Sequence, residues 1–238
     1  MICTKEWRQF FSSLSGYIAM IVFLLLCGLM LFVFPDTSLL DFGYASLTGF
    51  FEIAPWILLF LVPTVTMRSL ADEYKGGTFE ILKTMPLKPS QIVWGKFFGA
   101  LLVEALTLLP TIIYAFSIQA LSAVGGLDVG STIGSYIGLL MLGAVFTAVG
   151  VCTSSFTNNT IVAFVSGAFV CFLLYTGFEA ISKLPVFAAG ADYFIEMLGI
   201  KFHYNSISKG VIDIRDVIYF LGVIFLFMAI TQRNVAKK

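Results

Sequence analysis

Residues 129–178 read VGSTIGSYIGLLMLGAVFTAVGVCTSSFTNNTIVAFVSGAFVCFLLYTGF, which is 50 consecutive positions without a charged side chain. A single straight helix of that length would measure roughly 75 Å, whereas the hydrocarbon core of a bilayer is about 30 Å thick. The chain must therefore turn back inside this run. The polar stretch 153–160, TSSFTNNT, is the only plausible place for the turn, so the run predicts two consecutive membrane-spanning helices.

The composition of the whole chain points the same way. Of 238 residues, 59% are hydrophobic and 12% are charged, whereas soluble domains average about 45–50% apolar and about 25% charged residues. The 14 basic and 14 acidic residues cancel, which excludes a nucleic-acid binder with a basic surplus. The 16% share of aromatic residues excludes a disordered chain. The sequence therefore predicts a protein that is embedded in a lipid bilayer and does not bind nucleic acid.

Charge-poor runs elsewhere in the chain set the number of spans. We predict an all-α polytopic membrane protein that forms a single domain over residues 1–238, with six transmembrane helices at about residues 16–34, 44–67, 97–119, 131–152, 160–178 and 214–232. A count of seven or eight would promote residues 184–191 and 195–204, but these pieces are too short to cross a bilayer. They fit re-entrant or interfacial helices within an external segment, residues 179–213.

The first residues favour a helix that lies along the membrane surface. Trp7, Phe10, Phe11 and Leu14 recur at positions i, i+3, i+4 and i+7, which makes one apolar stripe on a helix. Such a helix over residues 4–15 would lie in the inner interface. The alternative is a cytoplasmic extension of the first span.

The distribution of lysine and arginine gives the predicted orientation. With the N-terminus inside, 10 of the 14 basic residues fall in inner segments, where these residues concentrate in membrane proteins. The connections after the first and third spans contain Asp36, Asp41 and Asp128 and no basic residue. Both termini are therefore predicted to be cytoplasmic. The formal charge then divides into +6 inside, −4 outside and −2 within the spans.

Motifs for catalysis or metal binding are missing from the sequence. There is no G-x-x-x-x-G-K-[ST] phosphate loop. The single histidine, His203, has no nearby cysteine or second histidine with which to build a metal site, and the four cysteines fit no zinc spacing. We therefore expect no catalytic residue, no metal site and no cofactor on this chain.

Two acidic residues lie within predicted spans, where a charge is expensive and suggests a function. Glu52 falls near the outer end of the second span, within reach of water or lipid headgroups. Glu104 lies about two turns past Lys96, roughly 10 Å into the membrane. Glu104 could face a partner helix or a neighbouring Thr107 or Arg68, and we favour a structural hydrogen bond for it. A place on a transport path is the alternative.

The cytoplasmic segment 72–96 carries the most distinctive pattern. A glycine pair permits a sharp turn, after which Thr78 can cap a short helix over residues 79–85 that a proline then ends. Phe79 and Leu82 share one face of this helix, which has no lipid or core of its own. Two turns of helix are not stable alone in water, so this face is expected to dock on another protein. An ordinary solvated loop is the alternative.

The same segment resembles a known family. The string Glu73-x-x-x-Gly77-Thr78-x-Glu80-x-Leu82-x-Thr84-x-Pro86, followed by Gly95-Lys96, is similar to the coupling-helix region of ABC-2-type transporter permeases. The order of the six spans and the large segment between the fifth and sixth match that family across nearly the whole chain. The resemblance implies a permease subunit of an ATP-driven exporter in a bacterial cytoplasmic (inner) membrane.

The resemblance also implies partners. Two permease subunits, as a homodimer or with an auxiliary membrane subunit, would bind two cytosolic ABC ATPase subunits. These would carry the ATP, so this chain would need no cofactor and would not be an enzyme. Closure of the ATPases would push on the short helix and tilt the spans. The resemblance assigns the ATPase contacts to Glu73, Gly77, Thr78, Phe79, Glu80, Leu82, Lys83, Thr84 and Pro86, with Phe79 and Leu82 as the apolar anchor.

A second stretch narrows the resemblance. The string His203-x-x-Ser206-Ile207-x-Lys209-Gly210-Val211-Ile212-Asp213-x-Arg215-Asp216-x-x-Tyr219-Phe220 resembles a subgroup that includes the gliding-motility-associated ABC transporter permease subunit, the F subunit. Within it, Asp213 can cap the last span, and Asp216 places an acid near the positive end of that helix. This explains both residues without substrate contact. We interpret His203 as an anchor at the membrane interface.

Two other functions remain open. An ion-coupled secondary transporter with Glu104 as the ion site would require inverted repeats and broken helices, and the sequence has no two halves with matching breaks. The other alternative is a membrane scaffold that anchors envelope machinery without transporting a substrate.

Overall fold

The computed structural model describes residues 7, 10, 14–33, 46–84, 88–122, 126–184 and 192–237, and every regular element within these ranges is a helix. The helices are α2 (Leu14–Phe32), α3 (Thr48–Thr66), α4 (Arg68–Lys75), α5 (Thr78–Thr84), α6 (Pro89–Leu108), α7 (Ile112–Leu121), α8 (Val129–Phe156), α9 (Thr160–Phe172), α10 (Phe178–Ser182), α11 (Asp192–Glu196), α12 (Ile200–Ile207) and α13 (Ile214–Lys237). A 3₁₀ turn, η1 (Leu109–Thr111), joins α6 to α7, and a π-helical turn, η2 (Leu173–Gly177), joins α9 to α10. Most of the predicted interfacial helix 4–15 lies outside the described residues.

Five stretches are long and apolar enough to cross a membrane. They are Thr48–Lys75, Pro89–Ala120, Val129–Phe156, Thr160–Ser182 and Ile214–Lys237. The expectation of an all-helical, multi-pass membrane protein is thereby confirmed. Helix α2 contains a shorter apolar stretch, Gly16–Phe32, so the sixth span remains a prediction.

Two predicted boundaries are shifted. The second predicted span ends at residue 67, but helix continues through α4 to Lys75, and the third begins at residue 97, although α6 begins at Pro89. Charged residues end an apolar run without ending a helix, so a boundary drawn from charge misses the extension through α4. The sequence predicts that Ser90 caps a helix that runs through Trp94 into the third span; α6 does run through Trp94, but it begins at Pro89, and the Gln91 side chain accepts a hydrogen bond from the Lys88 backbone N–H at 3.0 Å.

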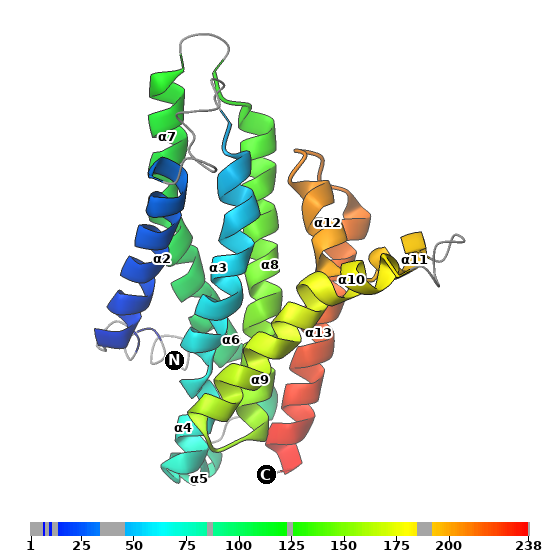
Figure 1. The fold of residues 1–238 in the computed structure, drawn as a ribbon. Coiled ribbons are helices and arrows are strands. Elements are labelled where there is room, and N and C mark those ends of the chain that lie inside the picture. The colour runs from blue at the N-terminus through cyan, green and yellow to red at the C-terminus, as the bar shows by residue number, and fades with distance from the viewer. Residues whose placement is uncertain are drawn as a thin grey trace.

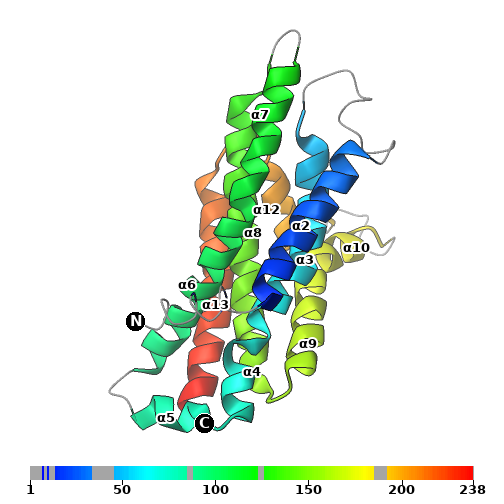
Figure 2. The same ribbon diagram turned by 90° about the vertical axis from the view of Figure 1, so that its left-hand side faces the viewer.

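Helix α8 runs through the middle of the bundle (Figures 1 and 2). It packs against α3, α4, α6, α9, α12 and α13, and 78% of its membrane-crossing stretch is buried, against 22% for α9 with α10. Helix α8 ends at Phe156 and α9 begins at Thr160, where the Asn159 side chain accepts a hydrogen bond from Ile161 N at 3.0 Å. The turn predicted within residues 153–160 is confirmed.

Glycines on α8 allow its neighbours to approach closely. A β-carbon on Gly134 would lie 2.9 Å from the backbone carbonyl oxygen of Ile207. One on Gly138 would lie 3.2 Å from Cγ2 of the Ile207 side chain. On another face, a β-carbon on Gly150 would overlap the hydroxyl of Thr66 in α3. Small residues at such crossings are typical of membrane helices, which pack through close van der Waals contact.

The two ends of the bundle carry different elements. Helices α4 and α5, the turn between α8 and α9, and the C-terminal end of α13 lie together at one end, which we call the α5 end (Figure 1). Helix α7 and the start of α8 reach the opposite end, which we call the α7 end. The segment with the permease-like motif and the external segment are therefore separated along the bundle.

Candidate functional site

The corner between α4 and α5 is formed as the glycine pair predicts. Gly77 has a φ of 67°, in the left-handed region that glycine adopts without strain, and the chain reverses there into α5. Thr78 is the first residue of α5, and its hydroxyl donates to the carbonyl oxygen of Glu73 at 3.4 Å. Its expected role as a cap outside the helix is therefore wrong, since the hydroxyl links α5 back to α4.

The apolar face of α5 packs inside the chain. Phe79 and Leu82 are 6% and 9% exposed, and the ring of Phe79 meets Tyr74 of α4 edge-on with ring centroids 4.8 Å apart. The expectation that this face lacks a core of its own is therefore wrong. The sequence of the short helix does not show what covers its apolar face, because α4 covers it only after the turn at Gly77.

The outward surface of the corner is polar. Lys75, Gly77, Thr78, Glu80 and Thr84 are exposed. The Lys83 side chain and the whole of Pro86 lie outside what the structure describes, so their ATPase contacts remain predictions. The corner therefore offers a polar surface supported from behind by two buried apolar side chains.

A serine from the central helix caps α4. The Ser154 hydroxyl accepts hydrogen bonds from Leu70 N and Ala71 N, both at 3.0 Å, and donates to the Met67 carbonyl oxygen at 3.0 Å. Helix α4 has no side-chain cap of its own at Met67. Because the first N–H groups of a helix have no partners within it, α8 completes the N-terminus of α4. The sequence contains no local signal for this contact.

A buried lysine joins α4 to α6. Lys96 is 2% exposed; its Nζ lies 3.0 Å from Glu73 Oε1 and donates to the carbonyl oxygen of Ser69. A buried ammonium group is tolerated only when it is paired and hydrogen-bonded. Glu73 was expected to contact an ATPase, but the structure directs one of its carboxylate oxygens to Lys96. Lys96 itself, the last residue of the motif, was not recognised as a site residue.

These contacts fasten the corner to two spans. Helix α5 packs on α4, α4 is held to α8 through Ser154, and α4 is held to α6 through Lys96. A force applied to the exposed side of α5 would therefore reach both α6 and the central helix.

Glu104 is buried between α6 and α8. It is 2% exposed, and the Thr147 hydroxyl donates to its Oε2 at 3.2 Å. Its carboxylate occupies the space that a β-carbon on Gly143 would take, and its Oε1 has no hydrogen-bond partner among the described residues. The favoured hydrogen bond is present and comes from a neighbouring helix, whereas Thr107 donates to Val103 O and Arg68 is exposed. Only the packing of α6 on α8 brings Thr147 to Glu104.

His203 of α12 forms a buried pair with Asp216 of α13. It is 3% exposed, its Nδ1 lies 2.7 Å from Asp216 Oδ1, and its Nε2 lies 2.8 Å from the carbonyl oxygen of Met197. The ring also stacks on Tyr219 with centroids 3.9 Å apart. Because a carbonyl can only accept, Nε2 carries a proton and donates it. The interpretation of His203 as an interfacial anchor is therefore wrong.

Asp213 and Asp216, at the N-terminal end of α13, make different contacts. Asp213 Oδ1 accepts a hydrogen bond from Arg215 N at 2.9 Å, so its predicted capping role is confirmed. Asp216 instead turns inward to His203 and joins α13 to α12. Their spacing along the chain gave no sign of this pair. Within the described part of the chain, no group of three or more His, Cys, Asp or Glu side chains could hold a metal ion.

These features define a multi-pass α-helical membrane protein with a short, doubly fastened helical corner at one end. Its sequence matches the family described as ABC-2 family transporter protein over residues 37–231, which is more than half of the chain. The chain belongs to this family, whose members are membrane subunits that normally work with a separate ABC ATPase. No curated protein matches the chain.

Proposed function

We propose that this chain is the permease subunit of an ATP-driven ABC-2-type exporter in a bacterial cytoplasmic membrane, with both termini in the cytoplasm. The α4–α5 corner receives the ATPase, which carries the ATP. The observation that supports this most is the fastening of an exposed polar corner to α8 and α6 through Ser154 and Lys96. A solvated loop would need no such support.

The geometry changes the part that each motif residue plays in this proposal. The exposed surface of Thr78, Glu80 and Thr84 makes the contact with the ATPase. Phe79 and Leu82 hold α5 on α4 instead of anchoring the partner. The motif then describes both a docking surface and the support beneath it.

Movement of the corner would reach the membrane through the central helix. ATP-driven closure of the ATPases would press on α5, and α4 would carry the displacement to α6 and α8. Besides α4, helix α8 packs against α3, α6, α9, α12 and α13. A tilt of α8 would therefore change its packing against all of these helices at once. A second permease subunit, either another copy or an auxiliary protein, would complete the path.

The narrower assignment to a gliding-motility permease rests on the stretch 203–220 alone. In this chain His203 and Asp216 bind each other, and Asp213 caps α13. These contacts explain why His203, Asp213 and Asp216 occur in this stretch without any contact to a particular substrate. In its general form, the proposal is an exporter whose substrate is unassigned. In its narrowest form, that exporter serves gliding motility.

An ion-coupled transporter that uses Glu104 fits the geometry less well. The Glu104 carboxylate is enclosed by Gly143 and Thr147 of α8. The structure has one cavity between α3, α8 and α12 and another beside α4 and α6, and Glu104 lines neither of these two. A membrane scaffold without transport would not need a corner fastened to two spans.

Co-purification tests the proposal. The chain is tagged, expressed in its native cells and purified in mild detergent, and any ATPase is identified by mass and by ATP hydrolysis. We expect Glu80→Lys to remove the ATPase, since Glu80 is exposed on α5, and Asp192→Lys to retain it, since Asp192 lies in α11, away from the α5 end. Absence of an ATPase from the wild-type preparation would overturn the proposal.

A further inference from the structure

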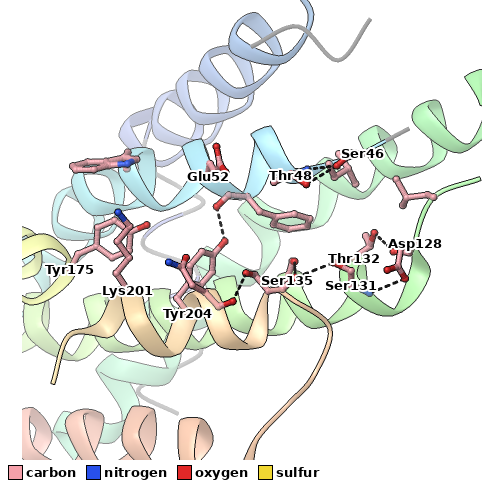
Figure 3. Close-up of a pocket in the computed structure, with 16 residues that line it drawn as sticks. Ser46, Thr48, Glu52, Asp128, Ser131, Thr132, Ser135, Tyr175, Lys201 and Tyr204 are labelled. Carbon is pink, nitrogen blue, oxygen red and sulfur yellow. Dashed lines mark hydrogen bonds between the residues drawn. The ribbon is translucent and has the colours of Figure 1, made fainter. Parts of the chain in front are cut away.

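A polar cavity of about 490 Å³ opens at the α7 end, between α3, α8 and α12. Its lining includes Glu52, Trp56, Asp128, Ser135, Tyr175 and Lys201. The lining residues extend in a row from Tyr175 and Lys201 at one end to Asp128 at the other (Figure 3). The volume is within the range of small-molecule sites, and the cavity is distinct from the α4–α5 corner.

Three hydroxyl groups that α8 contributes to the lining donate their protons to backbone carbonyls. Ser131 and Ser135 both donate to the carbonyl oxygen of Ser208 at 3.0 Å, and Thr132 donates to Asp128 O at 2.7 Å. Each hydroxyl has one proton and two lone pairs. With their protons already bound to backbone carbonyls, these groups offer a ligand only lone pairs.

The hydroxyl of Tyr204 also donates its proton to a backbone carbonyl. The acceptor is the Phe51 carbonyl oxygen, at 2.7 Å. Burial raises the pKa of the Tyr204 phenol well above its ordinary value, so the group keeps its proton and continues to donate it to the backbone. It adds another acceptor to the wall.

The charges in the lining favour a cation. Glu52 and Asp128 are carboxylates, and Lys201 is the only basic residue among the described residues that line the cavity. Lys201 Nζ lies 2.7 Å from Glu179 Oε2, and the other Glu179 oxygen lies 2.6 Å from Lys183, whose side chain is 72% exposed. Lys201 is thus paired with Glu179, which it shares with Lys183. Asp128 Oδ1 accepts hydrogen bonds from Gly130 N and Ser131 N and caps α8, whereas Glu52 forms no ion pair with the described residues and remains available to a ligand.

Aromatic rings complete the wall. Trp56 of α3 meets Tyr175 edge-on with ring centroids 5.6 Å apart, and Tyr175 belongs to the π-helical turn η2. Such turns are often found at functional sites. The faces of tryptophan and tyrosine attract cations within about 6 Å of the ring.

We propose that this cavity binds an organic ligand through a protonated primary amine. Its N–H groups would meet the carboxylate of Glu52 and hydroxyl lone pairs of the lining, and its apolar part would lie against Trp56, one turn further along α3. The inference goes beyond the proposed exporter function and does not depend on it.

Calorimetry on the full-length chain in mild detergent at pH 7 tests the chemistry with three matched probes. Benzylamine carries charge and N–H donors, benzyltrimethylammonium carries charge alone, and benzyl alcohol carries neither a charge nor an ammonium group. We expect benzylamine to bind about tenfold or more tightly than benzyl alcohol, as a charge-assisted hydrogen bond implies, with the quaternary probe in between. Equal affinities for the amine and the alcohol, or no binding of the amine, would overturn the proposal.

Variants locate the site. Glu52→Gln should weaken benzylamine binding about tenfold. Asp192→Asn, an exposed acid outside the cavity, serves as the matched control and should bind like the wild type. Gel filtration checks that each variant is folded. If Glu52→Gln binds benzylamine like the control, the proposal fails.

A primary ammonium group can come from a free amine or from a lipid headgroup, and competition separates the two sources. Short-chain phosphatidylethanolamine carries this group, whereas phosphatidylcholine of the same chain length does not. Displacement of benzylamine by the first lipid alone supports the site with a lipid as its ligand. Displacement by neither supports it with a soluble amine, and equal displacement by both would contradict recognition of the primary ammonium group.

Discussion

The hydroxyl of Ser154 accepts a hydrogen bond from the backbone N–H of Leu70 at 3.0 Å, although 84 positions separate the two residues. The first turn of α4 is therefore completed by a side chain from α8. This contact lies at the α5 end, where α4 carries the exposed corner and α8 enters the centre of the bundle. It makes the corner and the central helix parts of one hydrogen-bonded unit.

Replacing Ser154 with alanine tests this link. The change leaves the N–H groups of Leu70 and Ala71 without their acceptor, and we expect a loss of about 1–3 kcal/mol in the free energy of unfolding in detergent. In the assembled exporter, ATPase binding should persist while transport-linked ATP hydrolysis falls. Ser166→Ala is the matched control, because its hydroxyl binds only carbonyls of its own helix. Equal stability of the two variants would contradict the capping role.

The pair formed by Lys96 and Glu73 gives a second prediction. Lys96→Met keeps the aliphatic stem but leaves a partly buried carboxylate without its partner, so we expect a loss of about 3 kcal/mol in unfolding free energy. Lys88→Met is the control, since Lys88 is exposed, and it should change stability by less than about 0.5 kcal/mol. Adding Glu73→Gln to Lys96→Met should recover part of the loss, and strict additivity of the two changes would argue against the pair.

The sequence was a good guide to features that repeat along the chain or break its pattern locally. The charge-free run 129–178 had to contain a turn, and the structure puts it between Phe156 and Thr160. The glycine pair before Thr78 predicted the reversal into α5. Asp213 was recognised as a cap because its acceptor lies next to the start of a helix.

Contacts between distant helices could not be read in this way. Ser154, Lys96 and Thr147 are ordinary residues of their own helices, and their roles appear only when α4, α6 and α8 pack together. The same is true of Phe79, whose partner Tyr74 is near in sequence but faces it only after the turn at Gly77. Periodicity identifies an apolar face without identifying what covers it.

The buried pair of His203 and Asp216 leads to a third prediction. His203→Ala removes the partner of a carboxylate that is 4% exposed, so we expect the unfolding free energy to fall by about 2–4 kcal/mol. Protease cleavage around α11 and α12 should become faster, because α12 loses its tie to α13. Asp213→Asn is the control, since asparagine also caps a helix. Unchanged cleavage in His203→Ala would show that packing alone holds α12.

The contact between Glu104 and Gly143 gives the last prediction. A methyl group at Gly143 would overlap the Glu104 carboxylate, so Gly143→Ala should destabilise the chain by about 2–3 kcal/mol, as overpacking does. Gly222→Ala is the control, because nothing lies within 4 Å of its β-carbon position, and alanine there should be neutral or stabilising. Adding Glu104→Ala should relieve the clash, so the double variant should be more stable than the sum of the single changes predicts. Additive losses, measured by detergent unfolding, would contradict this packing.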